Sequence, residues 1–186
     1  MMLINNDTII KDSDPIMRKK SEKVNVPLTS EDHGLIMTML QYVRDSIDPQ
    51  KAEENNLRPA VGISAVQIGV LKQLVAISID YGEDGKTEYV LANPRIVSHS
   101  VQNAYLKNGE GCLSVLDEHE GHVFRHARIS VKAYDVLLKQ EVLIKAHGYE
   151  AIVLQHEIDH LSGKLFYDTI DPDNPWKEDP EALVIE

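Results

Sequence analysis

The residues with the clearest capacity for chemistry lie in one run, His156-Glu157-Ile158-Asp159-His160. Two histidines four residues apart share one face of a helix, so both imidazoles can bind the same cation. Glu157 is rotated from His156 by about 100° around the helix, so its carboxylate can reach a metal-bound water without binding the metal. The pattern predicts a hydrolytic metal site, and the alternative is a helix with two exposed histidines.

Two histidines leave a catalytic metal one protein ligand short. No histidine follows His160, and the glutamates after it lie in a proline-rich tail. The only cysteine, Cys112, is the better third ligand, because its small neighbours in Gly109–Ser114 allow close backbone approach. A lone cysteine is otherwise most often a small buried side chain, so this assignment depends on the incomplete two-histidine site.

The elements that position these residues begin with two helices. Apolar residues at helical spacing predict a helix over 30–47, capped by Thr29 and Asp32 and stopped by Pro49. A second helix over 150–162 carries both histidines and ends at Gly163. A short helical turn is expected after Pro15, before the first helix. The residues between the helices are expected to form a surface loop over 51–58 and strands over 73–80, 86–91, 95–101, 129–134 and 142–146, with a break at Asn93–Pro94.

Strands that follow strands, with helices near each end, indicate an α+β fold rather than alternating βαβ units. We expect one domain over 1–186, with antiparallel or mixed sheets packed around the central histidine-bearing helix and the N-terminal helix as a cover. Residues 168–186 form an acidic, proline-containing tail. Its apolar end, 182–185, is expected to dock as an edge strand.

Charge and composition exclude several classes of function. The chain has 30 acidic and 19 basic residues, a net charge of −11 and a pI near 5.1, which argues against non-specific DNA binding and anionic membranes. The N-terminus shows no secretory signal, and no segment has the apolar length of a membrane span. With one cysteine there is no internal disulfide, so we expect a cytoplasmic protein with a reduced thiol.

Three segments carry a family resemblance. Glu110–Ser114 and Gln155–Leu161 resemble two signature motifs of the peptide deformylase family, and Ala60–Gln67 resembles the third, in family order. The longer loops and the acidic tail are similar to the second bacterial subclass, which is common in Gram-positive bacteria. The resemblance implies an enzyme that removes the N-formyl group from the initiator methionine of new polypeptides and releases formate.

The resemblance also implies a metal centre with one divalent ion and water in the fourth position. It implies Fe²⁺ as the physiological ion, with Zn²⁺, Ni²⁺ or Co²⁺ able to replace it, and the ligand types alone are consistent with several of these. The implied ligands are Cys112, His156 and His160.

Catalytic roles follow from the same resemblance. The metal-bound water would attack the formyl carbon, and Glu157 would take its proton and later deliver it to the leaving amine. The side-chain amide of Gln67 and the backbone N–H of Leu113 would stabilise negative charge on the formyl oxygen.

Substrate binding is expected in an apolar pocket for methionine with backbone pairing along the peptide. By position, the pocket wall and the pairing residues are Val61, Gly62, Gly111, Tyr149 and Val153. Glu110 is expected to pair with Arg125 or Arg128 and so to brace the cysteine loop. We expect a monomer that acts on N-formylmethionyl nascent peptides, with a transient ribosome encounter and no DNA or membrane partner.

Two positions depart from the family pattern. Ala60 stands where the family prefers glycine, and Ser64 where it prefers alanine, so Ser64 adds a hydroxyl that needs a partner if buried. Two alternatives stay open: another metallopeptidase with a different third ligand, and a silent protein that binds formylated peptides without cleaving them. We interpret His119, His122 and His126 as a solvated strand and loop rather than a second metal site.

Overall fold

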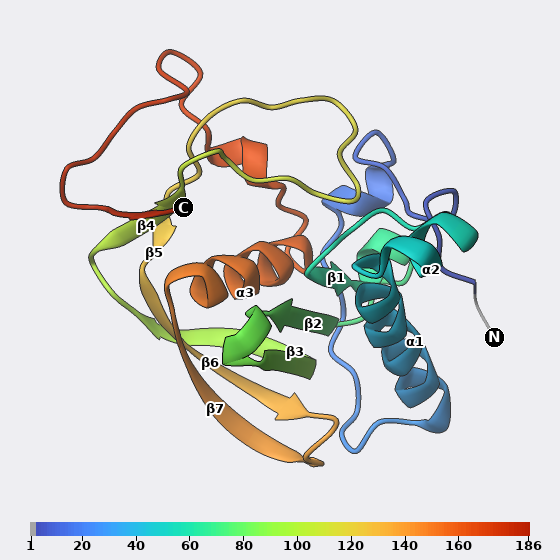
Figure 1. Cartoon of the computed structure of the whole chain (residues 1–186). Helices are drawn as coiled ribbons and strands as arrows, with labels where there is room; N and C mark the ends of the chain where they lie inside the picture. Colours follow the sequence, from blue (N-terminus) through green and yellow to red (C-terminus); the bar gives the residue numbers. More distant parts are fainter. Residues whose placement is uncertain (1–2) are drawn as a thin grey trace.

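The computed structural model describes residues 3–186, and its largest element is an antiparallel sheet of five strands (Figure 1). The strand order is β1-β2-β3-β6-β7, so the last two strands join the sheet beside β3. The strands are β1 (Gly62–Ser64), β2 (Leu74–Asp80), β3 (Lys86–His99), β6 (Arg128–Asp135) and β7 (Gln140–His147).

A second, three-stranded sheet has the order β5-β4-β8. Its strands are β4 (Asn103–Leu106), β5 (Arg125–His126) and β8 (Leu183–Ile185). The last strand pairs in parallel with β4, and this pairing confirms the edge strand expected over 182–185.

Within the described residues, three α-helices accompany the sheets: α1 (Ser30–Ser46), α2 (Pro49–Glu54) and α3 (Gly148–His160). The Thr29 hydroxyl accepts the Asp32 N–H, as the capping pattern predicts. The surface loop expected over 51–58 is wrong in its first half, because Asp48 caps α2 and Pro49 begins it. Residues 3–186 also contain four short 3₁₀ helices, at Pro15–Arg18, Ala65–Ile68, Gly82–Asp84 and Phe166–Thr169.

The break expected at Asn93–Pro94 is also wrong, since β3 runs through it as one strand. The pairing with β6 skips from Ala92 to Arg95, and this irregularity accommodates the missing N–H of Pro94. Asn93 has a φ of 54°, and its side-chain amide pairs with both backbone polar groups of Val24 at 2.9 and 2.8 Å. A turn-type residue here therefore serves a tertiary contact and does not end the strand.

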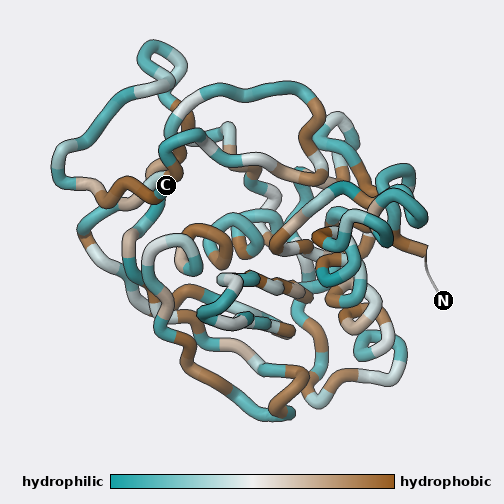
Figure 2. The backbone as a smooth tube through the Cα atoms, viewed as in Figure 1, coloured by the Kyte–Doolittle hydropathy of each residue, from teal (hydrophilic) through white to brown (hydrophobic). Residues whose placement is uncertain are grey.

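The five-stranded sheet is buried on both faces where it meets the helices. Alternate residues of β2 pack in two separate apolar clusters, Leu74 and Ala76 with α1, and Val75, Ile77 and Ile79 with α3. The hydropathy tube of Figure 2 shows apolar residues concentrated where α1, α3 and the sheet meet. Thus α3 lies between the large sheet and the small sheet, and α1 covers the opposite face of the large sheet.

The exit from α3 is fixed by a close backbone contact. Gly163 has a φ of +72°, and a Cβ at this position would lie 2.4 Å from the backbone oxygen of Arg18. Only glycine meets both requirements. Within residues 3–186, no helix is both long enough and apolar enough to cross a membrane.

Candidate metal centre

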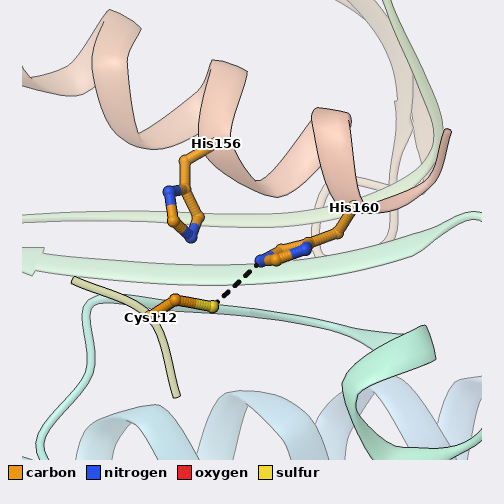
Figure 3. Close-up of side chains that lie close together, drawn as sticks. All are labelled: Cys112, His156 and His160. Carbon is orange, nitrogen blue, oxygen red and sulfur yellow. Dashed lines mark hydrogen bonds between the residues drawn. The ribbon is translucent and has the colours of Figure 1, made fainter. Parts of the chain in front are cut away.

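Three side chains converge at one end of α3. One ligand atom each from Cys112, His156 and His160 lies within 4.8 Å of the other two, and the Cys112 Sγ is 3.4 Å from the His160 Nε2 (Figure 3). The helix supplies both imidazoles from one face, and the loop after β4 brings the sulfur to them. In the part of the chain that the structure describes, this is the one such cluster of three or more metal-binding groups.

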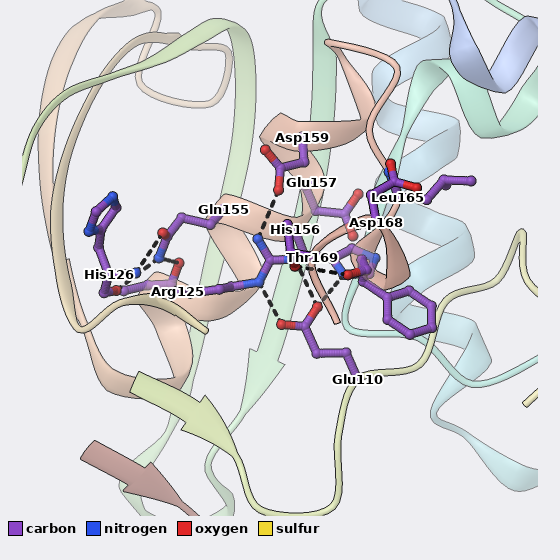
Figure 4. Close-up of polar contacts among 12 residues, drawn as sticks. Glu110, Arg125, His126, Gln155, His156, Glu157, Asp159, Leu165, Asp168 and Thr169 are labelled. Carbon is purple, nitrogen blue, oxygen red and sulfur yellow. Dashed lines mark hydrogen bonds and ion pairs between the residues drawn. The ribbon is translucent and has the colours of Figure 1, made fainter. Parts of the chain in front are cut away.

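The orientation of His156 is set by a buried ion-pair network (Figure 4). Its Nδ1 lies 2.8 Å from the Glu110 Oε2, which leaves Nε2 to face the cluster. Arg125 donates two hydrogen bonds to the Glu110 carboxylate, at 2.5 and 2.8 Å, and a third to Asp159 at 2.9 Å. Of the two arginines considered for Glu110, Arg125 is the partner, and Arg128 is exposed.

The two histidines differ in charge preference. Burial alone would lower the pKa of His156, but hydrogen bonds with Cys112 and Glu110 raise it to about 10. Burial, reinforced by His156, holds the pKa of His160 well below its ordinary value. The surroundings therefore favour a neutral donor at His160 and a positive charge at His156, which a divalent cation can supply in place of a proton.

Glu157 is buried directly beside the cluster and is held by strand β1. The Ser64 Oγ lies 2.7 Å from the Glu157 Oε2, and a Cβ on Gly62 would lie 2.6 Å from the Glu157 Oε1. Burial raises the pKa of Glu157, against the opposing effects of His156 and of the Ser64 hydrogen bond. A buried carboxylate with a raised pKa next to a metal site is a suitable proton acceptor and donor.

The amide of Gln67 also points into this cluster. Its Oε1 accepts the Ser64 N–H at 2.8 Å, which fixes the orientation of the amide and turns Nε2 toward the Cys112 Sγ at 3.5 Å and the Ser114 Oγ at 3.3 Å. Leu113, the neighbour of Cys112, is buried beside it. A preoriented amide N–H at this place can stabilise developing negative charge.

A cavity of about 350 Å³ opens onto these groups. The residues predicted for substrate binding all line it, namely Val61, Gly62, Gly111, Tyr149 and Val153. Sequence reasoning missed Ile152, Leu106 and Ile47, which line it too. Ile152 lies four residues before His156 on the same helix face, a spacing that could have identified it, whereas Leu106 and Ile47 carry no local signal.

The solvated segment predicted for His119, His122 and His126 is wrong for His122. This side chain is buried, packs edge-on against Trp176, and has its Nδ1 2.8 Å from the backbone oxygen of Lys177. It therefore fastens the C-terminal tail to the loop after the cysteine. Among the described residues, none of the three histidines belongs to a second metal-binding group.

The residues present fit a divalent metal ion. A sulfur and two imidazole nitrogens converge, one histidine is oriented by a carboxylate, and the network around it favours positive charge. Such a donor set suits Fe²⁺, Co²⁺, Ni²⁺ and Zn²⁺. Three protein ligands leave a coordination position for water or substrate, as a catalytic site needs.

Comparison with known proteins agrees with this reading. A family model described as polypeptide deformylase matches residues 6–176. Peptide deformylase 2 of Bacillus subtilis (strain 168) is 42% identical over 184 residues, which cover 99% of this chain and 100% of that protein. The peptide deformylase of Streptococcus pyogenes serotype M5 (strain Manfredo) is 45% identical over 193 aligned residues, covering 99% and 94%.

Solved structures show the same likeness. The peptide deformylase from Ehrlichia chaffeensis superposes with a TM-score of 0.71 at 29% identity, covering 90% of this chain and 89% of that one. A probable peptide deformylase from Synechococcus phage S-SSM7 superposes with a TM-score of 0.70 at 31% identity, covering 87% and 97%. The predicted mixed α+β class, with its antiparallel and mixed sheets, is confirmed by this likeness.

Proposed function

Because the chain belongs to the peptide deformylase family, we propose that it hydrolyses the N-formyl group of N-formylmethionyl peptides and releases formate. The observation that carries this proposal is the convergence of three metal-binding side chains, a buried carboxylate and an oriented amide beside one cavity with a largely apolar wall.

Glu157 acts as the general base and then as the general acid. It accepts a proton from the attacking water and delivers it to the amine that leaves when the C–N bond of the formamide breaks. Its burial and its contact with Ser64 support this role, because they hold the carboxylate beside the metal-binding cluster. General acid–base catalysis of this kind contributes roughly 10²–10⁴ in rate.

Charge on the formyl oxygen is stabilised by the side-chain amide of Gln67 and the backbone N–H of Leu113. The hydrogen bond from Ser64 to Gln67 supports this role, since it preorganises the amide before substrate arrives. Losing one donor of this type typically costs about 10²–10³ in turnover.

The methionine side chain enters the cavity, whose wall includes Val61, Tyr149 and Val153. The peptide backbone pairs with Val61–Gly62 on one side and with Gly111 on the other, as an added strand. Recognition through the backbone explains how one site accepts many sequences after the methionine.

The metal ligands are Cys112, His156 and His160, with Glu110 and Arg125 holding His156 in place. When bound, the ion supplies the Lewis acidity that activates water and polarises the formyl group. We propose Fe²⁺ as the physiological ion on the basis of the family resemblance. Anaerobic loading of the full chain with Fe²⁺, Zn²⁺, Ni²⁺ or Co²⁺, followed by turnover measurements, ranks the four.

The wider setting follows from the same proposal. Residues 1–186 act as a single catalytic domain whose tail begins near Asp168, and the second bacterial subclass stays a prediction. The enzyme is a cytoplasmic monomer that meets nascent chains, and its net charge of −11 favours only transient contact with ribosomal RNA.

The decisive experiment measures formate released from formyl-Met-Ala-Ser by anaerobically purified, Fe²⁺-loaded protein. Glu157→Gln is the matched control, because it preserves the shape of the side chain and the metal ligands but removes the base. We expect formate from the wild type and a loss of at least about 10²-fold in the variant. Peptide binding without formate from the wild type would instead support the silent binder.

A further inference from the structure

Ser64 has no assigned role in the reaction, yet it contacts two residues that have one, Glu157 and Gln67. We propose that Ser64 is a positioning residue, whose hydroxyl holds the Glu157 carboxylate in its reactive orientation while its backbone holds Gln67. This inference rests on the proposed function, since Glu157 and Gln67 take their roles from it.

The hydrogen bonds of Ser64 are short and buried away from solvent. Its side chain is fully buried, and its Oγ lies 2.7 Å from the Glu157 Oε2 and 2.8 Å from the Glu157 backbone oxygen. A hydroxyl has one proton, and the carboxylate is the stronger acceptor for it. Its backbone N–H meanwhile donates to the Gln67 Oε1 at 2.8 Å.

The strand that carries Ser64 holds both oxygens of the carboxylate. Gly62 and Ser64 are two residues apart in β1 and so face the same side of the sheet. Gly62 leaves room for the Glu157 Oε1, which would lie 2.6 Å from a Cβ there, while Ser64 binds Oε2. One oxygen is thus packed and the other is hydrogen-bonded, which fixes the rotation of the carboxylate plane.

The family pattern that this motif resembles prefers alanine at position 64, so Ser64 adds a hydroxyl to that pattern. An alanine would leave Oε2 without the hydroxyl and would free the carboxylate to rotate. Ser64→Ala removes only the oxygen, and it leaves the backbone hydrogen bond to Gln67 intact. The substitution therefore tests the hydroxyl contacts of Ser64, the one to the Glu157 carboxylate above all, while the backbone contact to Gln67 is retained.

The test compares Ser64→Ala with a matched control, Ser78→Ala, in the full Fe²⁺-loaded enzyme. Ser78 is equally buried and also donates to a carboxylate, that of Glu88 at 3.0 Å, away from the metal centre. We expect kcat to fall about tenfold in Ser64→Ala, the effect of one hydrogen bond to a charged group, with KM within about twofold. We expect Ser78→Ala to retain both constants.

Two further readouts separate positioning from a general structural effect. In the Glu157→Gln background, Ser64→Ala should cause no further loss of the residual rate, because the group it positions is gone. In zinc-loaded protein, the carboxylate infrared band of Glu157 is isolated by subtracting spectra of Glu157→Gln variants. This band should shift in Ser64→Ala and stay in place in Ser78→Ala.

The outcomes are distinguishable from failure of the function itself. A wild type that releases no formate overturns the proposed function. If the wild type is active, three results would overturn the role of Ser64 and leave the proposed function standing. These are a kcat of Ser64→Ala within twofold of the wild type, an equal loss of rate with and without Glu157→Gln, or an unshifted infrared band.

Discussion

The two long helices pack on opposite faces of the same sheet but are buried in different ways. Helix α1 buries a mostly apolar face, including Ile36, Met39, Leu40 and Val43, and exposes the other side. Helix α3 lies between two sheets and also buries Gln155, Glu157 and His160. Buried polar groups need partners, so α3 depends along its buried face on specific contacts from distant segments. The middle of α1 depends on apolar area, and its buried Asp32 and Ser46 lie near its two ends.

The largest effect should follow from removing the Cys112 thiol, which the loop after β4 brings to the two histidines of α3. Cys112→Ser replaces the sulfur ligand, and we expect metal affinity and turnover to fall by about 10²-fold or more, because first-row metals at such sites bind thiolate strongly. Metal content after dialysis and formate release give the measurement. Near-normal activity in this variant would favour a metallopeptidase with a different third ligand.

A loss of turnover without loss of the metal is expected when strand β1, which packs against α3, is altered. In Gly62→Ala the added Cβ meets the Glu157 side chain at 2.6 Å, so the carboxylate must move. We expect kcat to fall about 10²-fold, as a displacement of about 1 Å can cost this much, while bound metal stays stoichiometric. Gly34→Ala is the control, because a Cβ there meets nothing within 4 Å and Gly34 lies on an exposed position of α1. Unchanged kcat in Gly62→Ala would show that Glu157 can occupy another position.

A core substitution in helix α1 should lower the free energy of unfolding and leave the catalytic rate of the folded protein unchanged. Leu40 is completely buried in the cluster between α1 and the sheet, so Leu40→Ala should lower the free energy of unfolding by about 2–5 kcal/mol. Denaturant titration measures this loss. The folded fraction should keep the kcat of the wild type, and a large fall in kcat at low temperature would contradict the separation of the two helices.

The smallest effect concerns a partly exposed ion pair between Arg44 of α1 and Glu88 of β3. Hydrogen bonds from Arg44 lower the pKa of Glu88. Because the folded-state pKa is the lower one, the stabilisation is present above the unfolded value of 4.5 and is lost as pH falls through the folded value. Arg44→Met should therefore lower stability by less than about 1 kcal/mol at pH 7, as the Arg44 side chain is 38% exposed and solvent weakens the ion pair. The difference from wild type should shrink toward pH 3 in thermal melts.

The same contrast between the two helices explains which features could be predicted from the sequence. Apolar spacing predicts α1 well, because its burial is periodic, and the spacing of His156 and His160 is itself helical. The pairing of Ser64 with Glu157 joins residues 93 positions apart and has no local pattern. Likewise, β3 continues through Asn93 because that side chain is bound by Val24, a tertiary contact that overrides its turn preference.

The close approach of Gly163 to Arg18 has a consequence for the rotational phase of α3. The backbone exit after His160 is pinned to the N-terminal segment, so the helix cannot gain or lose a residue there without turning by about 100°. Such a turn would carry both imidazoles off the face that meets Cys112. The stretch from His156 to Gly163 is thus a segment of fixed length, in which a single insertion or deletion does more damage than most substitutions.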